Sequence, residues 1–410
     1  MKNIKRILFV HYGDDWIRGS ERCLLDLISH IDTTQFEPIV WTNNSMLALQ
    51  LQQQQVECYQ DDFPLLFGWH KPQLDLISWI KLLAKGRRLV QRKEIALVHV
   101  NSGAPCQWMT LVARSCGCPL VAHLHSEYLC RDRATLGLHL SPNIITASEA
   151  ITQKLRQDGY PNQNLTVVHN GINVTRLSEQ PEVNVAQRLN LDRDAVIFAT
   201  VGSLIHRKGV DRILIALRHL LLEYPNSHLV VVGSGEKRSE LIELSLSLHL
   251  EQHVHFVGEQ PNVVGWLKGC HAFVSAAREE AFGLVIAEAA VANLPIIAPF
   301  EGGIPEIVQH GKTALLYANY GYAPLLEMMS CIHSHPQECG EIAQRATEHI
   351  SEQFNVERYV GQIEQLYSRL IAETSPDFPP LHSCLKPLKI AIANRHKHGG
   401  NYDAPTQHHF

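Results

Sequence analysis

The stretch Arg278–Ala292 reads REEAFGLVIAEAAVA and lies between two apolar runs, HAFVSA (271–276) and PIIAP (295–299). Its small and apolar residues predict a buried helix, and the flanking runs predict strands. Strand, helix and strand in this order are typical of a parallel sheet covered by helices. Glu280 and Glu288 stand out in this stretch, because an ionised carboxylate is costly to bury unless other groups bind it. Either these two acids cap and flank the helix, or they serve a ligand.

The same alternation of short β-rich runs with helix-length stretches extends over most of the chain. It predicts an α/β protein with two doubly wound, Rossmann-like domains, residues 1–180 and residues 181–350. A long C-terminal helix is expected at 351–375, and a flexible tail at 376–410. The predicted strands are ILFV (7–10), EPIVW (37–41), VECY (56–59), IALVHV (95–100), PLVAHLH (119–125), NIITA (143–147) and LTVVH (165–169), then AVIFATVG (195–202), HLVVVG (228–233), HVHFVG (253–258) and the two runs quoted above.

Length and composition exclude several classes of protein. The 410 residues are too many for one ordinary core, and 45% hydrophobic residues suffice to fill two. The formal net charge of −5 gives no support to a nucleic-acid partner. Ten scattered cysteines without a Cys-x-x-Cys pair indicate reduced thiols and a cytoplasmic location. We expect no signal peptide and no spanning helix, so any membrane contact should be peripheral.

Two glycine turns follow predicted strands, where doubly wound sheets bind anionic ligands. Gly19 comes after the first strand, and Ser20 is predicted to cap the next helix. Arg207 and Lys208 stand beside Gly209 at a later helix entry, which suits a diphosphate because arginine offers a fork and lysine a point charge. A purely structural glycine and a solvated basic pair are the alternatives.

Two histidines end the strand at 119–125. His123 and His125 point to the same face, because side chains two apart on a strand share a face. Cys116 and Cys118 lie just upstream and raise a zinc site as an alternative, but this spacing is not that of a zinc finger.

Six motifs follow one another along the chain: RGSERCLLDLI near the start, HNGIN (169–173), VGSLIHRKGVD (201–211), VVVGSGE (230–236), REEAFGLVIAEA (278–289) and GGIPEIV (302–308). In this order they resemble the motifs of glycosyltransferase family 4, which comprises retaining, nucleotide-sugar-dependent enzymes of the GT-B fold. The resemblance extends from the first strand to the terminal helix. It implies two Rossmann-like domains that face a central cleft, with the C-terminal helix crossing back to the first domain.

The resemblance also implies a donor site around the quoted helix. Glu280 would accept hydrogen bonds from the hydroxyls of the donor sugar, and Glu288 from those of the ribose. The amides of Phe282, Gly283 and Leu284 would lie along the diphosphate and the sugar, with a helix dipole behind them.

The remaining implied roles concern the sugar and the leaving group. His125 is the better match to the family's sugar-contacting histidine, and His123 is expected in the core. Gly19, Arg207 and Lys208 would stabilise the charge that grows on the leaving diphosphate.

The chain departs from the family pattern at three places. Arg18 stands where the family often has a first glycine, and Ser203 where it has an arginine, whose charge Arg207 is expected to replace. Asn173 ends a turn that usually ends in aspartate. Asp192-Arg-Asp194 mimics the metal-binding Asp-x-Asp of another glycosyltransferase fold, but its position predicts a solvated turn. We expect no metal and no other cofactor.

The implied reaction is sugar transfer with retention from a nucleotide-diphosphate sugar, with a UDP-sugar expected first. A glycan or lipid-linked acceptor in polysaccharide or glycolipid biosynthesis is expected. A sugar-nucleotide oxidoreductase or epimerase is one alternative, but it would need Gly-x-Gly-x-x-Gly after the first strand, where the chain reads HYGDDWIRGS. A catalytically silent GT-B binding protein is the other.

Residues 64–93 are basic in a chain that is acidic overall. Helical spacing places Leu76, Trp79, Ile80 and Leu83 on one face. Packing on the sheet is one interpretation of this face. Contact with an anionic membrane surface is the other, because basic residues beside apolar ones are typical of peripheral proteins.

Overall fold

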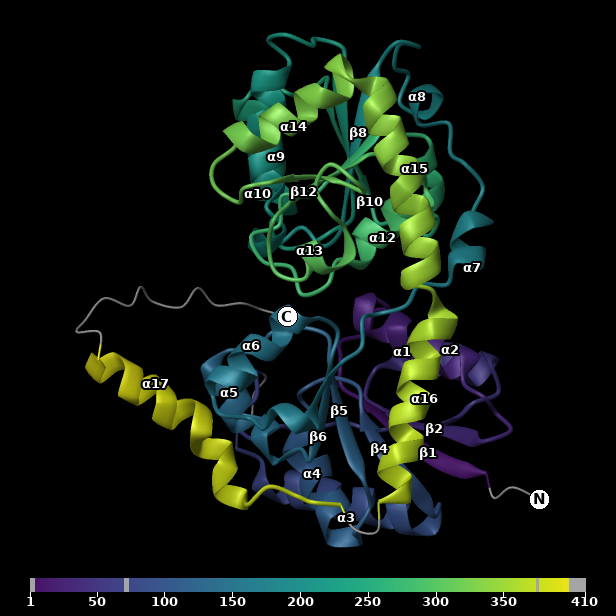
Figure 1. Cartoon of the computed structure of the whole chain (residues 1–410), viewed down its shortest axis with the longest axis vertical. Helices are drawn as coiled ribbons and strands as arrows, with labels where there is room; N and C mark the ends of the chain where they lie inside the picture. Colours follow the sequence, from purple (N-terminus) through teal and green to yellow (C-terminus); the bar gives the residue numbers. More distant parts are fainter. Residues whose placement is uncertain (1–3, 70–73, 374–375, 398–410) are drawn as a thin grey trace.

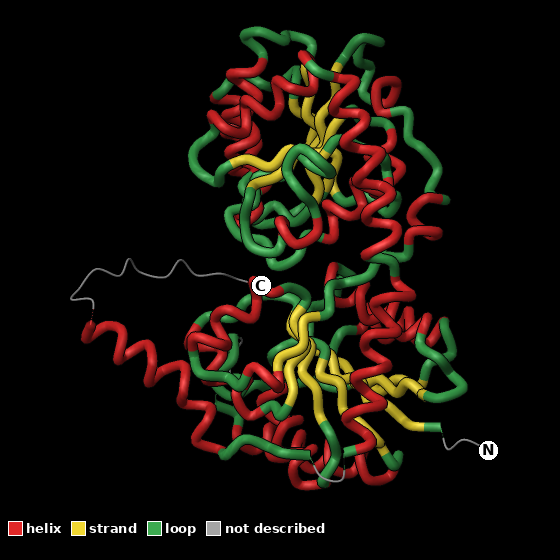
Figure 2. Tube along the Cα trace, viewed as in Figure 1, coloured by secondary structure: helices red, strands yellow, loops and turns green. Residues whose placement is uncertain are grey.

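The computed structural model describes residues 4–69, 74–373 and 376–397. Two α/β domains lie one above the other along the long axis of the molecule (Figure 1). Each contains a twisted parallel sheet between layers of helices (Figure 2). The predicted fold class is confirmed. None of the helices in the described part of the chain has the length and apolarity that crossing a bilayer requires.

The first domain contains a seven-stranded sheet in the order β3-β2-β1-β4-β5-β6-β7. Ile7 to His11 of β1 are all buried, as expected for a central strand covered on both faces. The strands are β1 (Lys5–His11), β2 (Phe36–Thr42), β3 (Glu57–Gln60), β4 (Ile95–Val100), β5 (Leu120–Leu124), β6 (Asn143–Thr146) and β7 (Leu165–Val167). The helices are α1 (Gly19–His30), α2 (Ser45–Gln53), α3 (Leu76–Arg92), α4 (Cys106–Cys116), α5 (Cys130–Thr135) and α6 (Glu149–Gln157), with 3₁₀ turns η1 (Leu138–Leu140) and η2 (Asn162–Asn164).

The second domain contains a six-stranded sheet in the order β10-β9-β8-β11-β12-β13. Its edge strand β13 has only three residues and was missed from the sequence. The strands are β8 (Val196–Val201), β9 (Ser227–Val232), β10 (Val254–Gly258), β11 (Ala272–Val274), β12 (Ile296–Pro299) and β13 (Leu315–Tyr317). The helices are α9 (Val210–Leu220), α10 (Arg238–Ser247), α11 (Val263–Lys268), α12 (Leu284–Val291), α13 (Ile304–Ile307), α14 (Ala323–Ser334) and α15 (Pro336–Gln353), with the 3₁₀ turn η3 (His206–Lys208).

The connections between the domains run in both directions. The short helices α7 (Val174–Ser178) and α8 (Val185–Arg188) lie on the path from β7 to β8, so position 180 falls between the two sheets. Helix α16 (Val356–Ala372) then returns to the first domain (Figure 1). Its apolar face, including Tyr359, Ile363 and Tyr367, joins the core formed by β1 and α1. The terminal helix therefore begins at Val356 instead of 351, because α15 already occupies the preceding residues.

Two local predictions were wrong. The N-cap of α1 is Arg18, and Ser20 lies inside the first turn, because Glu21 Oε2 accepts from the Arg18 amide at 3.0 Å and starts the helix earlier. The predicted tail at 376–410 contains η4 (Leu381–Leu385) and α17 (Lys386–Lys397) in its described part. These elements pack on the first domain, where Arg114 Nη1 donates to Pro379 O at 2.9 Å. Residues 398–410 lie outside the described residues.

Candidate active site

A pocket opens at the carboxyl ends of β8 and β11 in the second domain. Its lining includes Gly202, Ser203, Lys208, Glu280 and Gly283. Three of these, Lys208, Glu280 and Gly283, are predicted site residues, which the structure brings together from two segments of the chain. This is the edge of a doubly wound sheet at which ligands bind.

Glu280 is held at this pocket by two basic side chains. Lys208 Nζ donates to Glu280 Oε2 at 2.5 Å, and Arg207 Nη1 lies 3.8 Å from Oε1. The side chain of Glu280 is only 12% exposed. Burial acts to raise the pKa of Glu280, but Lys208 and Arg207 outweigh it, so the pKa lies below its ordinary value. Glu280 is therefore an ionised carboxylate that cations already bind.

The turn that carries Lys208 is fixed against the segment that carries Glu280. Gly209 has φ +66°, and a Cβ there would lie 1.9 Å from the carbonyl oxygen of Ala276, so only glycine fits. Arg278 binds both carboxylate oxygens of Asp211, at 2.9 and 2.6 Å. Arg207 Nη1 also donates to the Glu279 carbonyl at 2.7 Å. These contacts hold two basic groups and one carboxylate in a defined constellation.

Helix α12 begins beside this constellation. It starts at Leu284, and Gly283 precedes it with φ +103°. The Phe282 side chain is 3% exposed and packs near the rings of His169 and Phe354, with centroid distances of 6.0 and 6.1 Å. The Phe282 side chain therefore belongs to the core, and the use of its amide by a donor stays a prediction.

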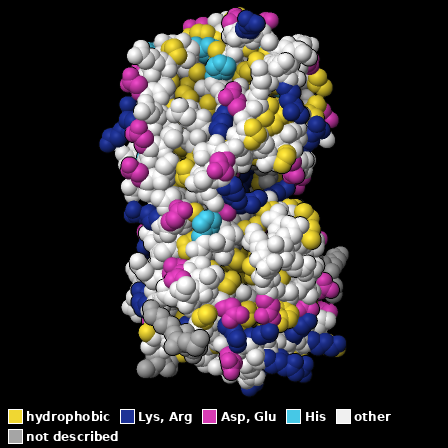
Figure 3. Space-filling model, turned by 90° about the vertical axis from the view of Figure 1, so that its right-hand side faces the viewer, with side chains coloured by type: hydrophobic (Ala, Val, Ile, Leu, Met, Phe, Trp, Pro, Cys, Tyr) yellow, Lys and Arg dark blue, Asp and Glu magenta, His cyan; other side chains and the backbone are white. Residues whose placement is uncertain are grey.

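Glu288 lies one turn further along α12 and faces the first domain. Burial raises its pKa to about 7, although Arg22 of α1 and Arg176 of α7 act in the opposite direction. Asp26 of α1 adds to the increase, and its Oδ2 lies 3.1 Å from Arg176 Nη2. Glu288 thus belongs to a group of charges where the domains meet. On the side of the molecule that bears α7 and α16, basic side chains occupy the notch between the domains (Figure 3).

Gly19 of the first domain lies next to the start of α12 in the second domain. A Cβ at Gly19 would lie 3.2 Å from Leu284 Cδ1. Two predicted donor-binding residues from different domains are therefore in contact, and a larger residue at position 19 would require the Leu284 side chain to move.

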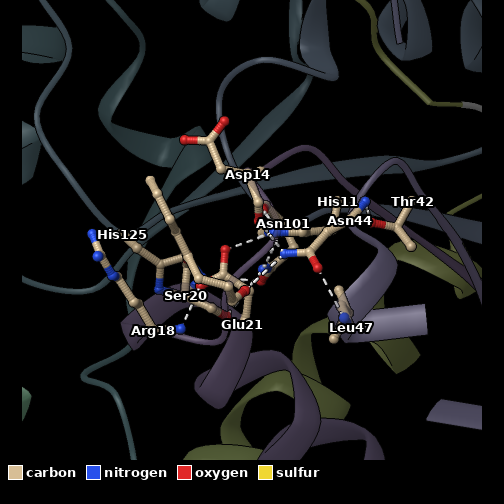
Figure 4. Close-up of polar contacts among 12 residues, drawn as sticks. His11, Asp14, Arg18, Ser20, Glu21, Thr42, Asn44, Leu47, Asn101 and His125 are labelled. Atoms are coloured by element: carbon tan, nitrogen blue, oxygen red, sulfur yellow. Dashed lines mark hydrogen bonds and ion pairs between the residues drawn. The ribbon is translucent and has the colours of Figure 1, made fainter. Parts of the chain in front are cut away.

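A buried polar network lies behind the Gly19 turn (Figure 4). His11 Nε2 lies 2.9 Å from Glu21 Oε1, and His11 Nδ1 lies 2.9 Å from the Asn101 carbonyl. The His11 contact lowers the pKa of Glu21 to about 2, against the opposing effect of burial. Asn101 Oδ1 lies 3.0 Å from Nε2 of His125. Sequence reasoning missed His11, Glu21 and Asn101; the only signal was their position at the ends of strands and at a helix start.

The His125 ring makes contacts with two neighbouring side chains of the first domain. Besides the Asn101 contact, its ring lies 4.1 Å from that of His123, centroid to centroid. Burial and His11 together lower the pKa of His125 to about 4, although Glu21 and the side chain of Asn170 act in the opposite direction, so the ring is neutral at pH 7. His123 is completely buried, in agreement with the core position predicted for it.

A second contact between domains involves two motifs that had no assigned role. Glu306 of α13 accepts from the amides of Glu149 and Ala150 at 2.7 and 2.9 Å, and so caps α6 of the first domain. His169 Nε2 lies 2.9 Å from Glu306 Oε2. Ser148 Oγ donates to the Ala281 carbonyl at 2.5 Å. A carboxylate at a helix N-terminus is favourable, so these contacts hold the domains face to face.

Metal ligands do not gather anywhere in the described residues: no group of three or more His, Cys, Asp or Glu side chains there could hold a metal ion. The Cys116, Cys118, His123 and His125 set therefore forms no such group.

Comparisons with known proteins agree with this architecture. Residues 17–176 match Glycosyltransferase Family 4, and residues 184–349 match Glycosyl transferases group 1. N-acetyl-alpha-D-glucosaminyl L-malate synthase of Bacillus anthracis is 23% identical over 299 residues, which are 70% of this chain and 78% of that protein. Glycogen synthase of Mycobacterium tuberculosis is 26% identical over 233 residues, 55% of this chain and 54% of that protein, so the match spans about half of that relative.

Solved structures show the same fold. Anabaena HepE in complex with UDP and glucose has a TM-score of 0.76 at 21% identity, and the match covers 89% of this chain and all of HepE. A glycosyltransferase from Rickettsia africae has a TM-score of 0.76 at 15% identity, covering 91% of this chain and all of that one. The chain is a glycosyltransferase of family 4 with the GT-B fold.

Proposed function

We propose that this glycosyltransferase moves a sugar from a nucleotide-diphosphate donor to a hydroxyl acceptor with retention of anomeric configuration. The observation that carries the proposal is the Lys208–Glu280 pair, which lies in a pocket at the strand ends. Gly19 and the first residue of α12 meet across the domains. Cations and helix amides around one pocket suit a diphosphate, and a carboxylate beside them suits sugar hydroxyls.

In the proposed mechanism the protein stabilises the negative charge that develops on the leaving diphosphate. The acceptor oxygen bonds to the anomeric carbon on the face from which the diphosphate leaves, the bond from that carbon to the diphosphate oxygen breaks, and the hydroxyl proton passes to the leaving phosphate. Lys208, Arg207, the amides of Gly283 and Leu284 and the close backbone of Gly19 stabilise the growing negative charge. When the diphosphate binds Lys208, Glu280 is released to accept hydrogen bonds from the sugar. Glu288 binds the ribose, and His125 lines the sugar on the opposite side.

We infer a UDP-sugar as the donor and no requirement for a metal. Structures of HepE contain UDP or UDP-glucose, and this supports UDP first. Arg207 and Lys208 supply the positive charge that a metal would otherwise bring to the diphosphate. The test is release of nucleoside diphosphate from UDP-, GDP- and ADP-linked sugars with and without EDTA, together with NMR of the product's anomeric proton. Activity that EDTA abolishes and Mg²⁺ restores would refute metal independence, and an inverted product would refute retention.

A glycan or lipid-linked acceptor, in polysaccharide or glycolipid biosynthesis, is the acceptor class we propose. The free thiols of Cys23, Cys106 and Cys118 fit the reducing conditions of the cytoplasm. A sugar-nucleotide oxidoreductase is not supported, because the turn after β1 lacks the dinucleotide motif. Turnover of any nucleotide sugar would exclude a catalytically silent protein.

We further propose that α3 touches an anionic membrane surface. The predicted apolar face divides in the structure: Trp79 and Leu83 pack on the core, whereas Leu76 and Ile80 are more than half exposed. Ile77 is 71% exposed beside them. Figure 3 shows Lys and Arg side chains at the lower end of the first domain, where Figure 1 places α3. The four residues 70–73 of the predicted segment lie outside the described residues.

Vesicle binding tests this surface. Sedimentation with anionic vesicles should fall when Arg87, Arg88 and Arg92 are changed to Glu, because each basic residue near the surface adds about 1 kcal/mol. Changing Ile77 to Ser should also weaken binding, whereas the three glutamates should leave donor turnover in detergent unchanged. If the protein does not bind anionic vesicles even at low salt, the proposed membrane surface is refuted and a soluble acceptor is favoured.

A further inference from the structure

Asn101 connects the two halves of the candidate site in the first domain. It directly follows β4 and is completely buried. Its Nδ2 donates to the carbonyl of Ser20 at 3.2 Å, and its Oδ1 lies 3.0 Å from Nε2 of His125 (Figure 4). One amide therefore binds both the turn that carries Gly19 and the histidine at the end of β5.

The partners of the amide decide its orientation. The Ser20 carbonyl can only accept a hydrogen bond, so the NH₂ group of Asn101 must face it. The amide oxygen then faces His125 and requires a donor there, which places the proton of the neutral imidazole on Nε2. A reversed amide would set two carbonyl-type oxygens against each other in a buried site, at the cost of an unsatisfied acceptor.

A buried hydrogen bond between His11 and Glu21 also anchors the turn. His11 and Glu21 are 1% and 3% exposed, and their side chains meet at 2.9 Å. The second carboxylate oxygen of Glu21 accepts from the Arg18 amide. Asn101 Nδ2 also lies 3.1 Å from His11 Nδ1. The backbone on both sides of Gly19 is thereby fixed to the groups that fix His125.

We propose that Asn101 is a positioning residue that ties the Arg18–Ser20 turn to His125 and holds His125 as its Nε2–H tautomer. This inference rests on the proposed function in one respect, since the turn and the histidine are those assigned to the donor's phosphate and sugar. The tautomer itself can be measured without any turnover, so the two proposals can fail separately.

The first test is ¹⁵N NMR of the full chain with labelled histidine, with the His125 signal identified by its loss in His125→Gln. In the wild type, Nε2 should carry the proton and Nδ1 should not. In Asn101→Leu, which has a similar shape and no polar atoms, the signal should move to a mixture of tautomers. An Nδ1–H ring in the wild type, or an unchanged tautomer in the variant, would overturn the proposal.

The second test is kinetic. Asn101→Leu removes the side-chain contacts with Ser20, His125 and His11, so kcat/KM for the donor should fall by roughly tenfold to a hundredfold. Asn43→Ala is the matched control, because Asn43 also uses both ends of its amide, but on the Gly13 backbone, at 3.0 and 2.9 Å. If the control shifts the His125 tautomer as much as Asn101→Leu does, the effect is general loosening and the proposal fails. If Asn101→Leu does not fold, Asn101→Asp takes its place: its carboxylate can only accept, so Nε2 should stay protonated while donor binding weakens.

Discussion

Glu280→Gln should tighten the binding of UDP while it impairs transfer. In the structure, Lys208 Nζ lies 2.5 Å from Glu280 Oε2, and Arg207 Nη1 lies 3.8 Å from Oε1. A diphosphate must therefore compete with Glu280 for the same cations. Removing the negative charge but keeping the size of the side chain removes this competition.

The magnitude follows from the geometry of the pair. At 2.5 Å, Coulomb's law gives roughly 2 kcal/mol in water and roughly 7 kcal/mol at an effective dielectric constant of 20. The side chains of Lys208 and Glu280 are 20% and 12% exposed, so water still reaches them and the net value is smaller. With about 1 to 2 kcal/mol recovered, UDP should bind about 5- to 30-fold more tightly to Glu280→Gln.

Transfer should change in the opposite direction. A hydrogen bond from a sugar hydroxyl to a charged carboxylate contributes about 1.5 to 3 kcal/mol, so kcat/KM should fall roughly tenfold to a hundredfold. Calorimetric titration with UDP and an assay of UDP release measure the two effects. Glu279→Gln is the matched control, because Glu279 is adjacent and exposed, and it should leave both quantities nearly unchanged. Weaker UDP binding in Glu280→Gln, or equal effects in the control, would refute the competition between Glu280 and the diphosphate.

Three further changes test other parts of the site. His125→Ala should depress transfer far more than His123→Ala, which should mainly lower the melting temperature because His123 is completely buried; equal effects on transfer would remove His125 from the site. Glu306→Gln should open the domains, seen as a larger radius of gyration by X-ray scattering. Because His169 and two amides hold the pKa of Glu306 below 4.5 against the effect of burial, the same opening should occur in the wild type only as the pH falls below that value. The wild type should lose about 3 kcal/mol of stability as the pH rises from 4.5 through about 7, because the raised pKa of Glu288 means that the fold is stabilised by this group only while it is protonated. Glu288→Gln should remove this loss. Identical pH profiles of the melting temperature in the two proteins would contradict the expectation.

The parts of the fold that depend on local sequence could be predicted. Central strands such as β1 are apolar on both faces, and turns such as that at Gly209 need a residue without a Cβ. The three-residue strand β13 could not be found, because so short an apolar run has no periodicity. The start of α1 was misplaced because the Glu21 side chain caps it from inside the helix.

The parts of the site that depend on long-range contacts could not be predicted. Lys208 and Glu280 lie in motifs that point to a donor, but their mutual ion pair exists only in the folded chain. Asn101 gave no signal beyond its position after a strand, because its partners lie 81 and 24 positions away in the sequence. Glu306 was quoted in a motif, yet its capping of α6 depends on how the two domains meet.

A crystal structure of the protein with UDP tests the central claim most directly. The diphosphate should lie between Lys208 and the first amides of α12, with the Lys208–Glu280 bond broken and Gly19 facing the phosphates. UDP bound at another place, or a diphosphate that leaves the Lys208–Glu280 bond intact, would contradict the proposed site.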